Sequence, residues 1–241
     1  MTTLIRCSGV WKKYRRSARG IKEMIVAPHK TGDGRYSREW ALRDVSFEVR
    51  RGGAFGVVGH NGSGKSTLLS LLLGVLRPDR GDISVSGRVA SLLELGAGFH
   101  PDLSGRENVF LYGAILGMCL REIRERFPEI LEFSGLDGAI DQPIRTYSAG
   151  MVARLGFSTI VHTPADVLLI DEVLAVGDAA FTEKCRAFFK DFRAKNGTLV
   201  IVSHDMGVLG DMCDEGICLS KGEVAHQGDI GGVIAHYQNT S

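Results

Sequence analysis

The sequence predicts an α/β fold in which helices cover a mainly parallel sheet, with a separate helical subdomain. Three observations predict it. Strand-like apolar runs alternate with helix-like segments, a glycine-rich loop joins one such run to a helix, and a block of helical pattern over residues 94–160 interrupts the alternation. At 241 residues the chain is long enough to bury a core and corresponds to one large domain or two small ones.

The N-terminal part is predicted to contain strands at residues 4–14, 44–50 and 54–58. The run DVSFEVR over 44–50 alternates apolar and polar residues with period 2, as a strand with one exposed face does. The run AFGVV over 54–58 is continuously apolar, which indicates a buried strand. Residues 15–40 are polar, basic and glycine-containing, and we expect them to form a long inserted loop.

The helical subdomain is predicted from its start signals and charge pattern. Ser104-Gly-Arg-Glu107 is a capping box ahead of an apolar run. Alternating charges over residues 120–127 indicate a second helix, which we expect Pro128 to break or restart. A further helix is expected over 148–162. After residue 162 strands and helices alternate again. The expected elements are a strand at DVLLID, a helix over 179–195, a strand at TLVIVSHD, a short helix, and the hairpin of EGICLS and EVAHQG around Lys221-Gly222.

Composition excludes several classes of protein. Lys plus Arg is 29 and Asp plus Glu is 28, a balance that argues against a nucleic-acid binder. No apolar stretch reaches the ~20 residues of a spanning helix, and the N-terminus lacks the apolar region of a secretory signal. The five cysteines form no CxxC pair, so we expect reduced thiols, with neither a disulfide framework nor a zinc site.

One segment departs from this charge balance. Residues 11–38 hold nine Lys or Arg and two acids, a net charge of +7. Two interpretations stay open: a solvated basic loop, or a segment that lies along an anionic membrane surface or faces a lipid-linked pyrophosphate.

The strongest motif is Gly59-His-Asn-Gly-Ser-Gly64-Lys65-Ser66, which fits GxxxxGK[ST] at every defined position. Glycines let successive backbone N–H groups turn inward and surround phosphate oxygens. Lys65 is expected to reach the β and γ phosphates, and the Ser66 hydroxyl to bind Mg²⁺. The predicted nucleotide-binding residues of this loop are His60, Asn61, Gly62, Ser63, Gly64, Lys65, Ser66 and Thr67.

A second motif, Val167-Leu-Leu-Ile-Asp171-Glu172, delivers two carboxylates to the end of an apolar strand. Asp171 is predicted to hold Mg²⁺, and Glu172 to polarise the attacking water. The alternative is a strand that ends in two solvated acids, which the phosphate loop upstream disfavours. Together the two motifs predict a nucleoside triphosphatase.

The residues Tyr147-Ser148-Ala149-Gly150-Met151, followed by Arg154, resemble the LSGGQ signature of ATP-binding cassette (ABC) ATPases. Ser148, Gly150 and Arg154 match, whereas Tyr, Ala and Met replace Leu, Gly and Gln. The resemblance implies a single nucleotide-binding domain over residues 1–241. Its fold would be the P-loop NTPase core of an ABC-type ATPase, with an antiparallel β portion near the N-terminus and a helical signature subdomain. Ser148 and Gly150 would face a γ-phosphate. An ordinary helix cap is the alternative for Ser148.

The same resemblance assigns three further positions. His204, in Ser203-His204-Asp205, matches the switch histidine that orients the attacking water. Asp178 matches the D-loop at the dimer interface and can also cap the helix from 179. Tyr14 matches the aromatic that stacks on adenine, with Trp11 as the competing aromatic and packing as the alternative for either.

One family element is missing. ABC ATPases usually carry a Gln at the entry to the helical subdomain, but residues 93–101 contain none. Glu94 is the nearest polar residue there, either as a metal contact or as a structural acid.

The segments ELGAGFHPDLSGREN, YSAGM and DEVLAVGD resemble the corresponding segments of the ATPase subunits of bacterial polysaccharide exporters. The long insert over residues 15–40 fits the O-antigen type of these exporters. This resemblance implies ATP and Mg²⁺ as cofactors and a head-to-tail homodimer. It also implies an integral-membrane permease that carries a lipid-linked polysaccharide, and a peripheral location on the cytoplasmic face of the bacterial inner membrane. No nucleic-acid partner is expected, and no C-terminal carbohydrate-binding domain is expected within this chain.

Three alternatives stay open. They are the ATPase of an importer or of an exporter with other cargo, a soluble ABC ATPase outside transport, and a scaffold that binds ATP without hydrolysis. The absence of a coiled coil and of a second cassette argues against the second, and Glu172 argues against the third.

Overall fold

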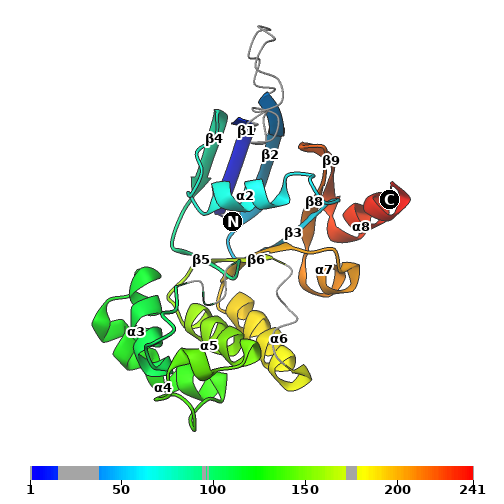
Figure 1. Ribbon diagram of the computed structural model, residues 1–241. Helices are drawn as coiled ribbons and strands as arrows, with labels where there is room; N and C mark the ends of the chain where they lie inside the picture. The colour runs from blue at the N-terminus through cyan, green and yellow to red at the C-terminus, as the bar shows by residue number, and fades with distance from the viewer. Residues whose placement is uncertain (1, 16–37, 94–95, 97, 172–177, 241) are drawn as a thin grey trace, which may run out of the picture.

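The computed structural model describes residues 2–15, 38–93, 96, 98–171 and 178–240. Two sheets and a group of helices make up the described part of the chain (Figure 1). The smaller sheet has three strands in the order β2-β1-β4 and the larger has six in the order β5-β6-β7-β3-β8-β9.

The smaller sheet is antiparallel and contains β1 (Thr3–Arg15), β2 (Arg38–Arg50) and β4 (Arg80–Val85). The pairing of β1 with β2 runs from Thr3 opposite Arg50 to Arg15 opposite Arg38. The second strand therefore begins six residues earlier than the alternating pattern alone predicted, because β1 offers a partner along its whole length. The rest of the basic insert, residues 16–37, lies outside the described residues.

The larger sheet contains β3 (Ala54–Val58), β5 (Val89–Ser91), β6 (Val167–Asp171), β7 (Thr198–Val202), β8 (Glu215–Ser220) and β9 (Glu223–Asp229). All neighbouring strands are parallel except β9, which runs antiparallel to β8. Lys221 and Gly222 connect these two with φ angles of 50° and 85°, the positive values that a tight hairpin turn needs.

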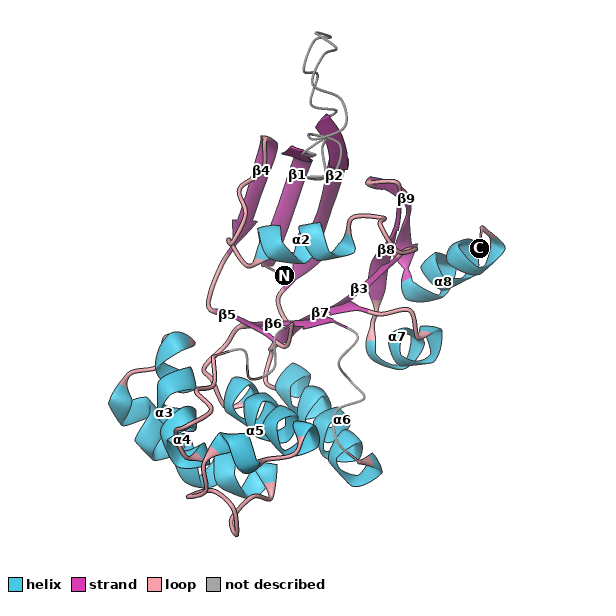
Figure 2. Ribbon diagram, in the orientation of Figure 1, coloured by secondary structure: helices cyan, strands magenta, loops and turns pink. Residues whose placement is uncertain are grey.

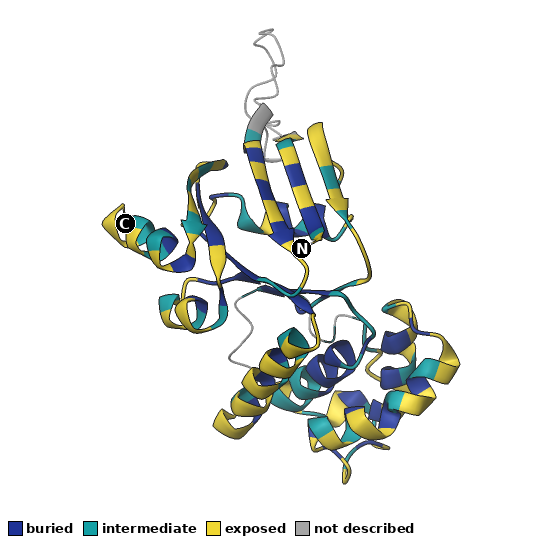
Figure 3. Ribbon diagram, turned by 180° about the vertical axis from the view of Figure 1, so that it is seen from behind, coloured by how far each residue is buried: buried dark blue, intermediate teal, exposed yellow. Residues whose placement is uncertain are grey.

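Both faces of the larger sheet are covered, which explains why its central strands are continuously apolar. Helix α2 (Lys65–Leu72) and the smaller sheet lie over one face (Figure 2). Helices α5 (Ala149–Val161), α6 (Ala179–Ala194), α7 (Met206–Met212) and α8 (Ile230–Asn239) lie over the other. Alternate residues of β3 serve the two cores: Phe55 and Val57 face the α2 side, and Ala54 and Val58 the side of α5 and α6. Figure 3 shows the buried central strands between the two layers.

The helical subdomain contains α3 (Gly105–Ile115), α4 (Leu120–Ser134), a 3₁₀ turn (Ile144–Thr146) and α5. The predicted capping box is confirmed: Glu107 N donates to Ser104 Oγ at 3.2 Å, and Ser104 N donates to Glu107 Oε2 at 2.8 Å. The expected break at Pro128 is wrong, because α4 continues through it. The helix forfeits one backbone hydrogen bond there, but Phe127 and Ile130 on either side are buried in the subdomain's own core and hold it together.

In the described part of the chain, no helix has the length and apolar character needed to cross a membrane. All five cysteines are free thiols in the structure. Burial raises the pKa of Cys7, Cys185 and Cys213 to about 12, so these thiols stay protonated.

Candidate functional site

The glycine-rich loop connects the end of β3 to the start of α2. Gly64 is the N-cap residue of α2, with φ 111°, and no side chain caps the helix there. Gly62 also has a positive φ of 81°. The first N–H groups of α2 therefore face outward without a capping side chain, which is the arrangement that binds a phosphate.

Neighbouring strands hold this loop from behind. A Cβ added to Gly64 would lie 2.6 Å from Leu42 Cδ2 and 2.7 Å from the Ala41 carbonyl oxygen, so β2 touches the loop directly. Gly222 N, in the β8–β9 turn, donates to the Ser63 carbonyl at 3.0 Å. The loop is thus supported from two sheets, although no local sequence pattern indicates either contact.

The Lys65 ammonium lies across the mouth of the loop. Its Nζ donates to the carbonyl of Gly59 at 2.6 Å and to that of His60 at 3.1 Å. This places a positive charge at the position expected for phosphate contact.

A cleft of about 290 Å³ opens in front of the loop and brings the two predicted motifs together. Its lining residues are Ala41, Asn61, Gly62, Gly64, Lys65, Ser66, Thr67 and Asp171. Sheet register explains the meeting: Asp171 pairs with Val202 of β7, and Val202 pairs with Val57 of β3, so the carboxyl ends of three parallel strands lie in one row. Ala41 is the lining residue that sequence reasoning missed, since nothing in its local pattern marks it.

The strand end at β7 places the predicted switch histidine beside this row. His204 is exposed and follows Val202 by two residues. Ser203 Oγ accepts from Asp205 N at 3.0 Å, and Asp205 caps α7 through the N–H groups of Gly207 and Val208. These contacts fix the backbone on both sides of His204.

The structure separates the two candidate aromatics. Tyr14 is 44% exposed, and its hydroxyl lies 3.4 Å from Oγ1 of Thr67, a residue of the cleft. Trp11 instead packs edge-on against Trp40 with ring centroids 5.1 Å apart, and the guanidinium of Arg80 lies over both rings. An exposed ring beside the cleft suits base stacking, so the geometry favours Tyr14.

The signature residues lie elsewhere. Ser148 caps α5 by accepting from Met151 N at 3.2 Å, and α5 covers the opposite face of the larger sheet from α2 (Figure 1). Neither Ser148 nor Gly150 is among the described residues that line the cleft. Tyr147, which replaces the usual Leu, is held in place because its hydroxyl donates to the Ala139 carbonyl at 2.6 Å. Burial also raises the pKa of this hydroxyl.

Arg154 connects the signature helix to the D-loop position. Its Nε donates to the Ser134 carbonyl at 3.0 Å, and its guanidinium lies 5.2 Å from the centroid of the Phe181 ring. It also approaches Asp178 Oδ2 at 3.9 Å. Asp178 caps α6 by accepting from Phe181 N at 2.8 Å, as the capping alternative predicted.

Two predicted residues, Glu94 and Glu172, lie outside the described residues. Of the residues predicted to hold Mg²⁺, the structure describes Ser66 and Asp171, and both line the cleft. These are hard oxygen donors, and Mg²⁺ commonly takes one or two protein oxygens together with water and phosphate. The residues present thus fit this ion.

Comparisons with known proteins show the family to which this chain belongs. A family model described as ABC transporter matches residues 42–175. The chain is 43% identical over 242 residues to the O-antigen export system ATP-binding protein RfbB of Klebsiella pneumoniae, covering 99% of this chain and 98% of that protein. It is 51% identical to the ABC transporter protein AbcA of Aeromonas salmonicida, covering 82% of this chain and 64% of AbcA.

A third relative, the teichoic acids export ATP-binding protein TagH of Bacillus cereus, is 39% identical, covering 99% of this chain and 43% of TagH. Among solved structures, the dimeric post-hydrolysis state of the ATP-binding cassette MJ0796 bound to ADP and Pi has a TM-score of 0.73 at 21% identity. It covers 94% of this chain and 98% of that one. The chain belongs to the ABC transporter family of ATP-binding proteins and is an ATPase of that family. The predicted fold class and family are confirmed.

Proposed function

We propose that this chain is the ATP-hydrolysing subunit of an ABC exporter that moves a lipid-linked polysaccharide, such as O-antigen, across the bacterial inner membrane. The observation that carries the proposal is the cleft shared by the glycine-rich loop and Asp171. The cargo is supported by relatives whose names state O-antigen export and teichoic acid export. In this proposal residues 1–241 form a single nucleotide-binding domain.

In this proposal each predicted site residue has one task. The N–H groups at the start of α2 and the Lys65 ammonium bind the phosphates, and Tyr14 stacks on the base. Ser66 and Asp171 hold Mg²⁺, which offsets the phosphate charge when bound. Glu172 follows Asp171 in the chain and accepts a proton from the attacking water, which His204 orients.

A second copy of the chain completes the site. Ser148 and Gly150 stand at the N-terminus of α5, on the other side of the sheet from the loop they are proposed to serve. A head-to-tail homodimer places these residues of one subunit against the nucleotide held by its partner. ATP bound between the two subunits stabilises the closed dimer, and its hydrolysis lets the dimer open again. Nucleotide binding therefore shifts the equilibrium between the open and closed forms of the dimer.

The helical subdomain is proposed to contact the permease. It carries exposed apolar side chains at Leu111, Ile115 and Leu120, which suit an apolar partner surface. The proposed attachment is peripheral, through the permease at the cytoplasmic face of the inner membrane.

A mixed-dimer experiment tests the shared site. A Lys65→Ala protein lacks the phosphate contact, and a Gly150→Asp protein places an acid where the signature faces the γ-phosphate. Each protein alone forms dimers with both sites damaged. Mixing them creates dimers in which one site has an intact loop and an intact signature. In a 1:1 mixture half of the dimers are of this kind and each has one intact site of two, so ATPase activity is expected to recover toward about a quarter of the wild-type rate. Mixtures as inactive as the separate proteins would refute the shared site.

A cellular experiment tests the cargo. The gene is deleted in the source bacterium and restored as wild type or as Lys65→Ala, and surface polysaccharide is detected by blotting. The expected result is loss of surface glycan with lipid-linked polymer retained inside, rescued by wild type alone. Unchanged surface glycan would leave the ATPase assignment standing and refute polysaccharide as the cargo.

A further inference from the structure

The C-terminal helix α8 touches the phosphate loop. The rings of Tyr237 on α8 and His60 in the loop have centroids 5.0 Å apart and are inclined by 38°. Tyr237 is half-buried and packs against the core on the α5 and α6 side of the larger sheet, whereas His60 is exposed. An element more than 160 residues downstream therefore contacts the loop proposed to bind ATP.

The start of α8 is anchored on the strand that leads into this loop. Ile230 fills a space left by two glycines: a Cβ added to Gly56 of β3 would lie 2.7 Å from Ile230 Cδ1, and one added to Gly216 of β8 would lie 3.2 Å from it. Gly56 stands four residues before His60. Both glycines thus let α8 approach β3 closely.

The spacing of Ile230 and Tyr237 lets α8 contact both β3 and the loop that follows it. Tyr237 follows Ile230 by seven residues, which places both on one face of the helix, about 10 Å apart along its axis. Gly56 and His60 are four residues apart, about 13 Å if extended. The two spans are of similar length, so one helix face contacts the strand at its centre and the loop beyond its end.

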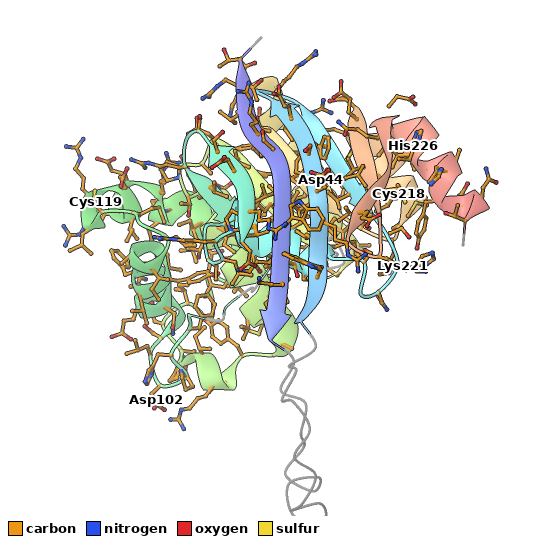
Figure 4. All side chains as sticks on the ribbon, turned by 90° about the horizontal axis from the view of Figure 1, so that it is seen from above. Asp44, Asp102, Cys119, Cys218, Lys221 and His226 are labelled. Carbon is orange, nitrogen blue, oxygen red and sulfur yellow. The ribbon has the colours of Figure 1, made fainter. Side chains whose placement is uncertain are left out.

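A second contact holds α8 against the sheet. The rings of His236 on α8 and His226 on β9 are stacked, with centroids 5.1 Å apart and planes inclined by 15°. Figure 4 shows His226 beside α8. Ile230 therefore holds the N-terminus of α8, and the stacked pair of His236 and His226 holds its C-terminal half. Together these contacts fix the position of Tyr237.

We propose that Tyr237 is a positioning residue for nucleotide binding: its ring holds His60 and thereby keeps the phosphate loop in the conformation that receives ATP. The inference rests on the proposed function of the loop. It makes the nucleotide affinity of the P-loop dependent on how α8 packs.

The test measures the Kd of a non-hydrolysable ATP analogue by calorimetry, together with kcat and KM for ATP. Tyr237→Leu removes the ring and is expected to raise the Kd and KM by about 2- to 10-fold, the size of an aromatic pair, with kcat little changed. Tyr237→Phe keeps the ring and is expected to bind as wild type does. Gln238→Ala, at the exposed neighbouring position, is the matched control.

A double-mutant cycle then separates positioning from general stability. If Tyr237 acts through His60, adding Tyr237→Leu to His60→Ala weakens binding less than twofold further. Effects that multiply independently, or a Tyr237→Leu protein with wild-type affinity, would overturn the inference. Tyr237→Met replaces Leu in the cycle if melting curves show that the Leu protein unfolds. A wild-type chain that fails to bind the analogue would instead refute the proposed function.

Discussion

Replacing Gly64 by alanine should destabilise the protein more than the same replacement at Gly62. Both glycines have positive φ angles, 111° and 81°, so alanine at either position carries a torsional cost of about 1–2 kcal/mol. They differ in their surroundings. A Cβ at Gly64 would meet the Ala41 carbonyl oxygen at 2.7 Å and Leu42 Cδ2 at 2.6 Å, whereas a Cβ at Gly62 has no neighbour within 4 Å.

The steric difference sets the expected magnitude. Overpacking of this kind adds about 1–3 kcal/mol, because the backbone carbonyl cannot rotate aside. Since 1 kcal/mol shifts the Tm of a protein of this size by about 2–4 °C, Gly64→Ala is expected to melt roughly 2–12 °C below Gly62→Ala. Thermal unfolding followed by circular dichroism measures both, with the wild type alongside. Equal melting temperatures for the two variants would refute the claim that β2 supports the loop through this contact.

Three further outcomes are expected. Ser66→Ala should reduce Mg²⁺-dependent ATP hydrolysis on the order of 100-fold in a phosphate-release assay, and retained activity would remove Ser66 from the metal site. Burial lowers the pKa of His162 below its ordinary 6.5. Below pH 6.5 the unfolded chain therefore binds more protons at this residue than the folded chain does, and the free energy of unfolding decreases as the pH falls. Urea unfolding near pH 7.5 and 5.5 should therefore show a smaller pH dependence in His162→Phe than in wild type, and equal dependence would contradict this. Arg154→Met should lower the free energy of unfolding by about 1–3 kcal/mol in the same urea assay, since it removes the hydrogen bond to the Ser134 carbonyl; an unchanged value would show that this contact contributes nothing.

Local patterns predicted the backbone structure of several segments well. The glycine-rich loop, the strand that ends at Asp171, the capping box at Ser104 and the hairpin at Lys221-Gly222 all depend on residues close together in sequence, where backbone angles and periodicity decide the outcome. Sheet register then brought Asp171 to the loop, as the rule for parallel strands implies.

Other elements had too weak a local signal. Strand β4 is largely exposed, β5 has three residues, and α8 mixes glycines with apolar residues; none of them shows a strong period. Pro128 carries a breaking signal that packing overrode, because the side chains around it are buried on one continuous helix face. Long-range contacts, which a local window does not contain, decided these cases.

The sequence by itself determined the chemistry of this protein: a phosphate loop, an acid-tipped strand and a signature motif whose residue types and spacing suit ATP hydrolysis. The tertiary structure decided which side chains share a space. It placed Tyr14, and not Trp11, beside the cleft, set Ser148 on the far side of the sheet, and brought Tyr237 against His60. The physical reason is that such contacts depend on strand register and helix packing between segments far apart in the chain, which residue spacing does not encode.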